Sequence, residues 1–125
     1  MSRRTDPFVQ VEILRRIFEL FPIAVLITDA RDRILEANPA VSKILGYTHE
    51  ELLAARPEEI HAACAEDYRS FVGRILSEIH VETDALTWSG KDQRIIPVHM
   101  DGTAVEVSGQ WCIVTRVTRL SLTGP

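Results

Sequence analysis

Apolar residues near the start of the chain recur with the period of an amphipathic helix. Asp6 and Pro7 favour a helix start, because aspartate caps free backbone amides and proline fits the first helical position. The helix is predicted to end before Pro22, with an apolar stripe of Val9, Ile13, Leu14, Ile17, Phe18 and Phe21. Three more residues widen this surface, namely Phe8, Val11 and Leu20. We expect such a helix to contact a second chain as well as its own domain, the alternative being that it only covers its own core.

The next segment consists of two β-rich runs around a turn. Residues 23–29 form a continuous run that ends at Asp29, the letters "ARDR" turn the chain, and "ILEA" returns. This pattern predicts an antiparallel hairpin. We expect the Asp29 carboxylate to accept backbone amide hydrogens at the corner, and we assign it no catalytic role.

Two short helices are predicted directly after the hairpin. In "NPAVSKILG", Asn38 is a good N-cap, Pro39 suits the following position, and Gly46 suits a left-handed helix end. In "THEELL", Thr48 and Glu51 have the spacing of a capping box. The chain is therefore expected to form two helices joined at a Gly-Tyr corner.

The second half of the chain changes from a helical period to a strand period. Residues 66–80 carry the strongest helical pattern, formed by Tyr68, Phe71, Val72, Ile75, Leu76 and Ile79. From residue 81 the period is two, with turns at "GKDQ" and "SGQ". Asp101-Gly102 is interpreted either as a hairpin turn or as a bulge in one long strand. The order of elements predicts an α+β domain with an antiparallel sheet of about five strands.

Composition and charge narrow the class of protein. The 125 residues fit one domain, and 46% hydrophobic with 26% charged residues is ordinary for a globular chain. The net charge of −4 argues against nucleic-acid binding. No apolar run approaches the roughly 18 residues of a membrane span, and no signal peptide is recognisable. Cys64 and Cys112 form no metal-binding motif and are interpreted as reduced thiols of a cytoplasmic protein, with a disulfide between them left open.

The order of elements and the motifs together resemble a PAS domain, the sensor module of many bacterial signalling proteins. The resemblance covers roughly residues 14–120, in the pieces "IFELFPIAVLITDARDRILEANPAVSKILGYTHEELL", "AEDYRSFVGRIL", "IIPV" and "GQWCIVTRVTRL". It implies a five-stranded antiparallel sheet of order 2-1-5-4-3, with helices on one face and an N-terminal flanking helix. The chain is accordingly divided into a flanking helix (1–21), a PAS core (22–120) and a tail toward an output region (121–125).

The resemblance also implies a regulatory function. PAS domains sit in signal-transduction proteins such as the histidine kinases of two-component systems or cyclic-dinucleotide enzymes, so the domain itself is not expected to be an enzyme. The expected partners are a second copy of the chain through the flanking helix, a downstream output domain and a small-molecule ligand, with neither nucleic acid nor a membrane. The family's usual Asp-Ile-Thr ending is replaced by Arg119-Leu120-Ser121, so the usual salt bridge to the output segment cannot form.

The cavity between helices and sheet is where PAS domains hold haem, flavin or small metabolites. Here its expected lining is Tyr68, Phe71, Val72, Ile75, Trp88, Ile96 and Trp111. Tyrosine and tryptophan combine a large apolar body with a polar atom, which suits an uncharged aromatic or amphipathic ligand. The same residues would also fill a plain core, so a ligand-free dimerisation module is the alternative.

Histidine and cysteine are the residue types that could bind a cofactor in this family. His61 is the candidate axial ligand for haem, because some haem-binding PAS domains carry a histidine on the short helix before the long one, and an ordinary packing role is the alternative. A flavin adduct is not expected, because Cys64 lies outside the Asn-Cys-Arg-Phe-Leu motif of the light-sensing members. Of the other histidines, His49 falls in a capping segment, His80 at a helix end and His99 on a strand. Neither a catalytic site nor a metal site is predicted.

Overall fold

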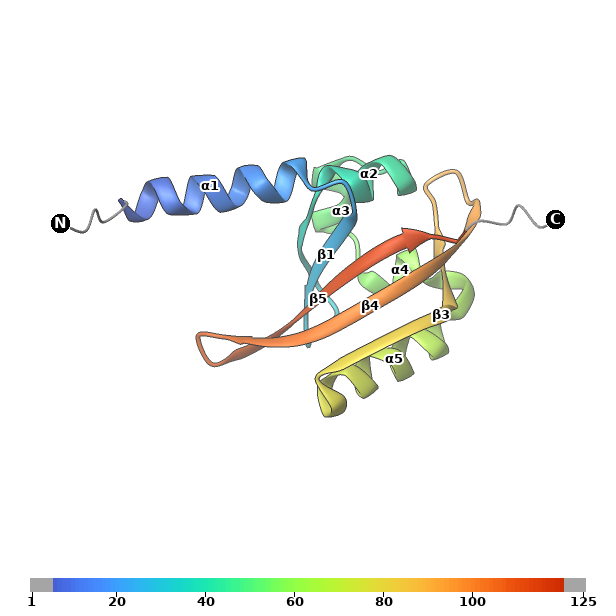
Figure 1. The fold of residues 1–125 in the computed structure, drawn as a ribbon. Helices are drawn as coiled ribbons and strands as arrows, with labels where there is room; N and C mark the ends of the chain where they lie inside the picture. Colours follow the sequence, from blue (N-terminus) through green and yellow to red (C-terminus); the bar gives the residue numbers. More distant parts are fainter. Residues whose placement is uncertain (1–5, 121–125) are drawn as a thin grey trace.

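A five-stranded antiparallel sheet forms the centre of the structure, a computed structural model that describes residues 6–120 (Figure 1). The strand order is β2-β1-β5-β4-β3, which confirms the predicted sheet. The strands are β1 (Ala24–Asp29), β2 (Ile34–Ala37), β3 (His80–Ser89), β4 (Ile95–Val107) and β5 (Gln110–Arg119). The predicted tail, residues 121–125, lies outside the described residues.

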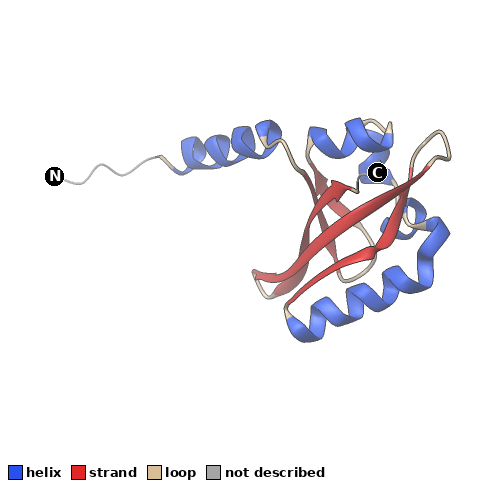
Figure 2. Ribbon diagram, turned by 45° about the vertical axis from the view of Figure 1, so that its right-hand side comes forward, coloured by secondary structure: helices blue, strands red, loops and turns tan. Residues whose placement is uncertain are grey.

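The helices between β2 and β3 cover one face of this sheet (Figure 2). They are α2 (Pro39–Leu45), α3 (His49–Ala54), α4 (Pro57–Ile60), the 3-10 turn η1 (Ala62–Cys64) and α5 (Ala65–Glu78). The core lies between them and the inner face of the sheet, where its buried side chains include Leu26, Leu45, Leu52, Ile75, Val98, Met100 and Val117. The N-terminal helix α1 (Pro7–Leu20) extends away from this body.

Local capping signals set most helix ends where the sequence predicts them. The Asp6 side chain accepts a hydrogen bond from the backbone N–H of Phe8 at 2.8 Å and so caps α1. Gly46 ends α2 with a left-handed φ of 83°. Thr48 and Glu51 form the complete capping box at the start of α3. These interactions are made within a few residues of one another, which is why the sequence alone reveals them.

Two polar segments, at Asp29 and at Asp101-Gly102, are candidate turns in the sequence, and only the first is a turn in the structure. Asp29 accepts hydrogen bonds from the backbone N–H groups of Arg31 and Arg33 at 2.8 and 3.1 Å, which confirms its predicted role at the β1–β2 corner. These bonds and the Arg33 guanidinium outweigh the effect of burial and lower the pKa of Asp29. Asp101-Gly102 makes neither the turn nor the bulge considered for it, because β4 continues through it as one strand and both residues pair with β3 in regular register.

Asn38 occupies the predicted N-cap position of α2, but its side chain does not cap the helix. Its Oδ1 instead accepts a hydrogen bond from the N–H of Val25 at 2.9 Å, and its Nδ2 donates to the carbonyl of Ile23 at 2.8 Å. Asn38 is completely buried. Its side chain therefore ties the start of α2 to the start of β1, and the expectation that it acts as a side-chain cap is wrong.

The junction between α5 and β3 also differs from the sequence pattern. α5 ends at Glu78, and Ile79 takes a left-handed φ of 73°. His80 is consequently the first residue of β3, so the expectation that it ends a helix is wrong. In the strand its Nε2 lies 2.6 Å from Oδ1 of Asp101 on β4.

α5 packs directly on β4 at Gly102. A Cβ atom at this position would lie 2.5 Å from Cδ1 of Ile75 and 3.3 Å from Cζ of Phe71. Both side chains are buried, so neither has free space into which to move. The glycine is thus required by the close approach of the helix and the strand.

Candidate functional site

A fully buried histidine lies at the centre of the domain, directly after α4. The Nε1–H of Trp88 donates a hydrogen bond to Nε2 of His61 at 3.2 Å, and Nδ1 of His61 lies 3.1 Å from the carbonyl oxygen of Thr87. Because the indole nitrogen can only donate, Nε2 is the acceptor and Nδ1 carries the proton. The ring also stacks on Tyr68, with centroids 4.1 Å apart and an angle of 9° between the planes.

This environment holds His61 in its neutral form. Burial lowers its pKa from 6.5 to about 4, and the hydrogen bond to Thr87 only partly offsets that effect. Both ring nitrogens are engaged within the protein, so an iron atom would have to displace Trp88 from Nε2. The residues around His61 therefore do not fit haem, and they favour a structural role for this side chain.

The predicted pocket residues fall into three groups. Five are buried in one core cluster, namely Tyr68, Phe71, Ile75, Trp88 and Ile96. Val72 is partly buried against that cluster. Trp111 is 43% exposed, because it lies opposite Glu106 near the end of a β4–β5 hairpin that projects past α5 (Figure 1). The structure thus brings six of the seven residues together and does not bring Trp111 to them.

A groove of about 440 Å³ opens where α5 faces the β1–β2 turn. Two predicted pocket residues, Tyr68 and Val72, line it together with charged groups that include Asp32, Arg56 and Glu58. Arg56 Nε lies 3.6 Å from Oδ2 of Asp32. Burial, together with the nearby carboxylate of Glu58, raises the pKa of Asp32. The groove therefore combines an aromatic and apolar wall with a charged rim.

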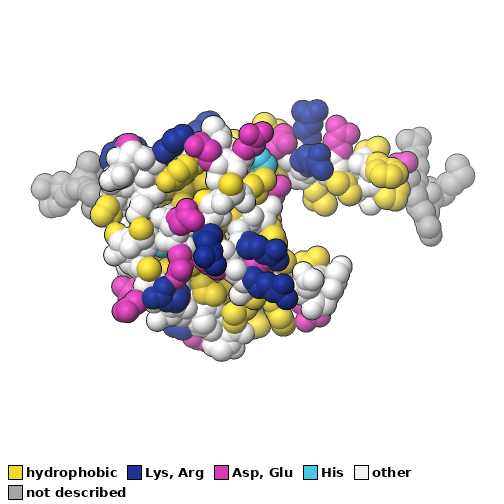
Figure 3. Space-filling view, turned by 180° about the vertical axis from the view of Figure 1, so that it is seen from behind, with side chains coloured by type: hydrophobic (Ala, Val, Ile, Leu, Met, Phe, Trp, Pro, Cys, Tyr) yellow, Lys and Arg dark blue, Asp and Glu magenta, His cyan; other side chains and the backbone are white. Residues whose placement is uncertain are grey.

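A second groove, of about 800 Å³, separates α1 from the body of the domain. α1 lines it with Val11, Leu14 and Phe18, and the body lines it with residues that include Ile27 and Pro39. None of the residues of α1 is buried. Figure 3 shows α1 as an arm with hydrophobic side chains along its length and a hollow beside it. The apolar face that the sequence predicts is thus present, and its own domain leaves it uncovered.

The structure shows the state of the two cysteines and the membrane-spanning potential of the helices. Cys64 and Cys112, which both lie in the described part of the chain, are free thiols. The Sγ atom of Cys64 lies 3.5 Å from the carbonyl oxygen of Thr87, beside the buried histidine. Among residues 6–120, no helix has the length and apolar character needed to cross a membrane.

One group of polar residues is brought together only by the structure. His80, Glu82 and Asp84 alternate along β3, and His99 and Asp101 alternate along β4, all on the outer face of the sheet. The signal in the sequence is the spacing of two in "HVETD" and "HMD". That spacing does not reveal the cluster, because pairing of the two segments depends on the register of the strands.

The sheet order, the helices on one face and the projecting N-terminal helix define a small α+β domain. The chain belongs to the PAS domain family, whose sequence model matches residues 12–80, more than half of the chain. PAS domains are sensor modules and are generally not enzymes. No curated protein matches the chain.

Several solved PAS domains are similar to this structure. A PAS domain from a two-component sensor histidine kinase is 16% identical, with a TM-score of 0.82 over 92% of this chain and 100% of that one. A PAS domain from Desulfitobacterium hafniense is 26% identical, with a TM-score of 0.72 over 84% and 99% of the two chains. The PAS domain of an HTR-like protein from Haloarcula marismortui is 18% identical, with a TM-score of 0.79 over 90% and 93%. These likenesses support the assignment of the fold.

Proposed function

We propose that this chain is the regulatory PAS domain of a signal-transduction protein and that it acts as a homodimer formed through α1. The observation that carries the proposal is the exposure of apolar side chains on α1, which reaches 85% for Phe8, 66% for Leu14 and 80% for Leu20. An isolated helix of 14 residues is marginal in water and needs a packing partner for its apolar face. Exposed apolar surface of this extent is typical of interaction sites.

A second copy of the chain is the partner that this surface suits best. In a twofold dimer the same patch lies on both sides of the interface, so pairing two α1 helices covers two exposed apolar faces at once. The groove of about 800 Å³ continues this surface onto the body of the domain, through Ile27 and Pro39. The partner's helix can therefore pack against both α1 and the core.

Such a dimer is proposed to regulate a domain that follows it in the same protein, with a histidine kinase as the first candidate. Two of the similar structures support this choice, since they come from a two-component sensor histidine kinase and from a sensor histidine kinase/response regulator of Geobacter sulfurreducens. In this chain β5 ends at the exposed Arg119, and Ser121 lies outside the described residues. The altered coupling through Arg119-Leu120-Ser121 stays a prediction.

The dimer is tested by placing a charge on the apolar face of α1. Leu14→Glu is expected to weaken self-association, measured by sedimentation equilibrium, by at least about 30-fold, since a central apolar contact contributes roughly 2 kcal/mol. Gln10→Glu is the matched control, because it adds the same charge to the same helix at an exposed polar position. A monomeric unmodified chain at high micromolar concentration would contradict the proposal, as would equal dimerisation of the two variants.

A second candidate function, the binding of a small molecule, is favoured by the groove that contains Tyr68 and Val72. Its volume of about 440 Å³ lies within the usual range for ligand pockets. The wall of Tyr68 and the rim formed by Asp32 and Arg56 suit a ligand with an aromatic body and polar ends. Ligand-free dimerisation is the competing hypothesis.

Native mass spectrometry of protein purified from cells tests the ligand. We expect a bound small molecule to be lost in Val72→Trp, whose indole fills the groove, and to be retained in Val107→Trp. Val107 lies at the exposed end of β4, so the control introduces the same side chain away from the groove. The absence of a co-purifying molecule from the unmodified protein would favour the ligand-free module instead.

A further inference from the structure

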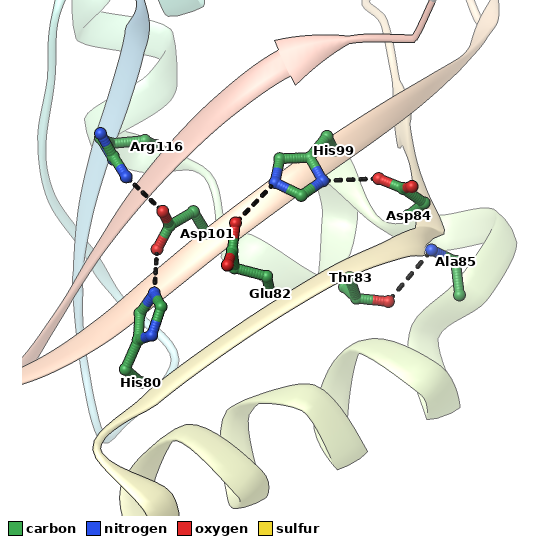
Figure 4. Close-up of polar contacts among 8 residues, drawn as sticks. All are labelled: His80, Glu82, Thr83, Asp84, Ala85, His99, Asp101 and Arg116. Atoms are coloured by element: carbon green, nitrogen blue, oxygen red, sulfur yellow. Dashed lines mark hydrogen bonds and ion pairs between the residues drawn. The ribbon is translucent and has the colours of Figure 1, made fainter.

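The outer face of the sheet gathers imidazole and carboxylate groups from neighbouring strands. Figure 4 shows His80, Glu82 and Asp84 on β3 directed toward His99 and Asp101 on β4. Successive side chains of a strand point to opposite faces, so residues separated by two share one face. These side chains lie on the face opposite the helices, because Val81 and Met100, which come between them along the two strands, are buried in the core.

Three of these side chains converge on one point. His80, Glu82 and Asp101 each offer a nitrogen or carboxylate oxygen, and these three atoms all lie within 4.8 Å of one another. Nε2 of His80 and Oδ1 of Asp101 are 2.6 Å apart. Glu82 and Asp101 are directly opposite each other in the antiparallel register of β3 and β4. Two like charges directly opposite each other destabilise a sheet.

The surrounding residues orient two of the three converging groups. Arg116 on β5 contacts Oδ2 of Asp101, which leaves Oδ1 directed toward His80. Nε2 of His99 lies 3.1 Å from Oε1 of Glu82, and the other ring nitrogen of His99 contacts Asp84. Partners of this kind, which hold a carboxylate or imidazole in place from behind, are typical of metal sites.

The charge of the cluster suits a dication. Three carboxylates (Glu82, Asp84 and Asp101) outnumber the guanidinium of Arg116, which leaves a charge of −2 before the two histidines are counted. A cavity of about 200 Å³ lies beside this cluster and is lined by Glu82 and Asp101, but not by His80, together with Ile23, His99, Arg116 and Thr118. An ion bound by His80, Glu82 and Asp101 would lie next to this cavity and would be open to solvent on the side of His80, whose side chain is 51% exposed.

We propose that His80, Glu82 and Asp101 form a binding site for a first-row transition-metal dication of the Zn²⁺ type, with water completing the coordination. One imidazole and two carboxylates form a donor set that Zn²⁺ accepts, with metal–ligand distances of about 2.0–2.2 Å. Imidazole favours such metals over Mg²⁺ and Ca²⁺, which prefer sites built from oxygen alone. The ion takes the position between Nε2 of His80 and Oδ1 of Asp101, which separate by less than about 1 Å to reach the roughly 3.3 Å of a tetrahedral site.

Metal binding would give the domain a second signal to respond to, separate from dimerisation. A metal held by His80, Glu82 and Asp101 joins β3 to β4 and stabilises the folded state according to its affinity. None of these residues lines the groove beside α1, so metal binding is tested independently of dimerisation.

The experiment is isothermal titration calorimetry at pH 7.5. Zn²⁺ is titrated into untagged protein from which bound metal has been removed with a chelator. We expect one Zn²⁺ per chain and an affinity at least about tenfold lower in His80→Gln and in Glu82→Gln. Both side chains are largely accessible to solvent, so these variants are expected to fold, which circular dichroism verifies. His49→Gln is the matched control, because His49 forms an exposed pair with Glu36, Nε2 to Oε1 2.6 Å, elsewhere on the surface.

The outcomes separate the proposal from general surface binding. Loss of Zn²⁺ affinity in His80→Gln and Glu82→Gln, with His49→Gln unchanged, supports the site. Equal affinity in all four proteins overturns it, as does displacement of Zn²⁺ by millimolar Mg²⁺, which would assign the site to a different class of cation. A Co²⁺ titration adds an independent readout, since the visible absorption of bound Co²⁺ is expected to change in His80→Gln and not in His49→Gln.

Discussion

Lowering the pH from 6.5 to 4 is expected to destabilise the domain by about 3 kcal/mol through His61 alone, given its pKa of about 4 in the folded state and 6.5 in the unfolded chain. Between these values the unfolded chain binds a proton that the folded chain excludes. The stabilising contribution of His61 to the free energy of unfolding is therefore fully present above pH 6.5 and is lost progressively as the pH falls toward 4.

The physical cause is the hydrogen-bond arrangement around the buried ring. A proton on Nε2 of His61 would face the Nε1–H of Trp88, so that two donors would oppose each other in a site without water access. The carbonyl of Thr87 accepts from Nδ1 in either state and cannot compensate for that clash. Protonation is thus coupled to loss of the packing around α4 and β3.

Urea unfolding of the unmodified protein and of His61→Gln between pH 7.5 and 4.5 measures this effect. Glutamine supplies an amide group that donates and a carbonyl oxygen that accepts, but it does not titrate. The free energy of unfolding of His61→Gln is therefore expected to fall less steeply with decreasing pH than that of the unmodified protein, by up to about 1.4 kcal/mol per pH unit. His99→Gln is the control, because the hydrogen bond that His99 donates to Asp84 raises the pKa of His99, so its contribution to stability is lost as the pH rises. A difference between unmodified protein and His61→Gln that is constant across this range would contradict the predicted titration.

The elements of the fold can be predicted from the sequence where short-range interactions determine them. The cap at Asp6, the capping box at Thr48 and the left-handed end at Gly46 all involve residues within four positions of one another. The period of two in the last third of the chain predicts the three long strands. Such signals do not depend on how distant segments pack.

The interactions of the candidate sites cannot be predicted in this way, because they connect residues far apart in the chain. His61 contacts Thr87 and Trp88, which lie 26 and 27 residues further along the chain. These partners hold the imidazole in its neutral form and favour a structural role for it. The sequence pattern places His80 in a helix because the helical period continues to Ile79, whose positive φ the period does not reveal. Which residues oppose one another across β3 and β4 depends on the register of the sheet, which the spacing within each strand leaves open.

Asn38 shows most clearly the difference between an interaction that is local in the sequence and one that joins distant segments. Its replacement by serine is expected to destabilise the domain by about 2–4 kcal/mol. As an N-cap, serine is as good as asparagine, so a capping role predicts almost no change. The structure assigns both polar atoms of the Asn38 side chain to the start of the first strand, through the N–H of Val25 and the carbonyl of Ile23. A hydroxyl group on the shorter serine side chain cannot reach both, which leaves buried backbone groups without partners.

Thr48→Ser provides the matched control for this prediction. Thr48 is a true side-chain cap, whose Oγ1 accepts a hydrogen bond from the N–H of Glu51 at 3.1 Å, and serine retains that oxygen. Urea unfolding at pH 7 is therefore expected to show a large loss for Asn38→Ser and a change below about 0.5 kcal/mol for Thr48→Ser. Equal, small effects at both positions would return Asn38 to the role of an ordinary cap. A large loss at Asn38 alone would identify it as the residue that holds α2 against the first strand of the sheet.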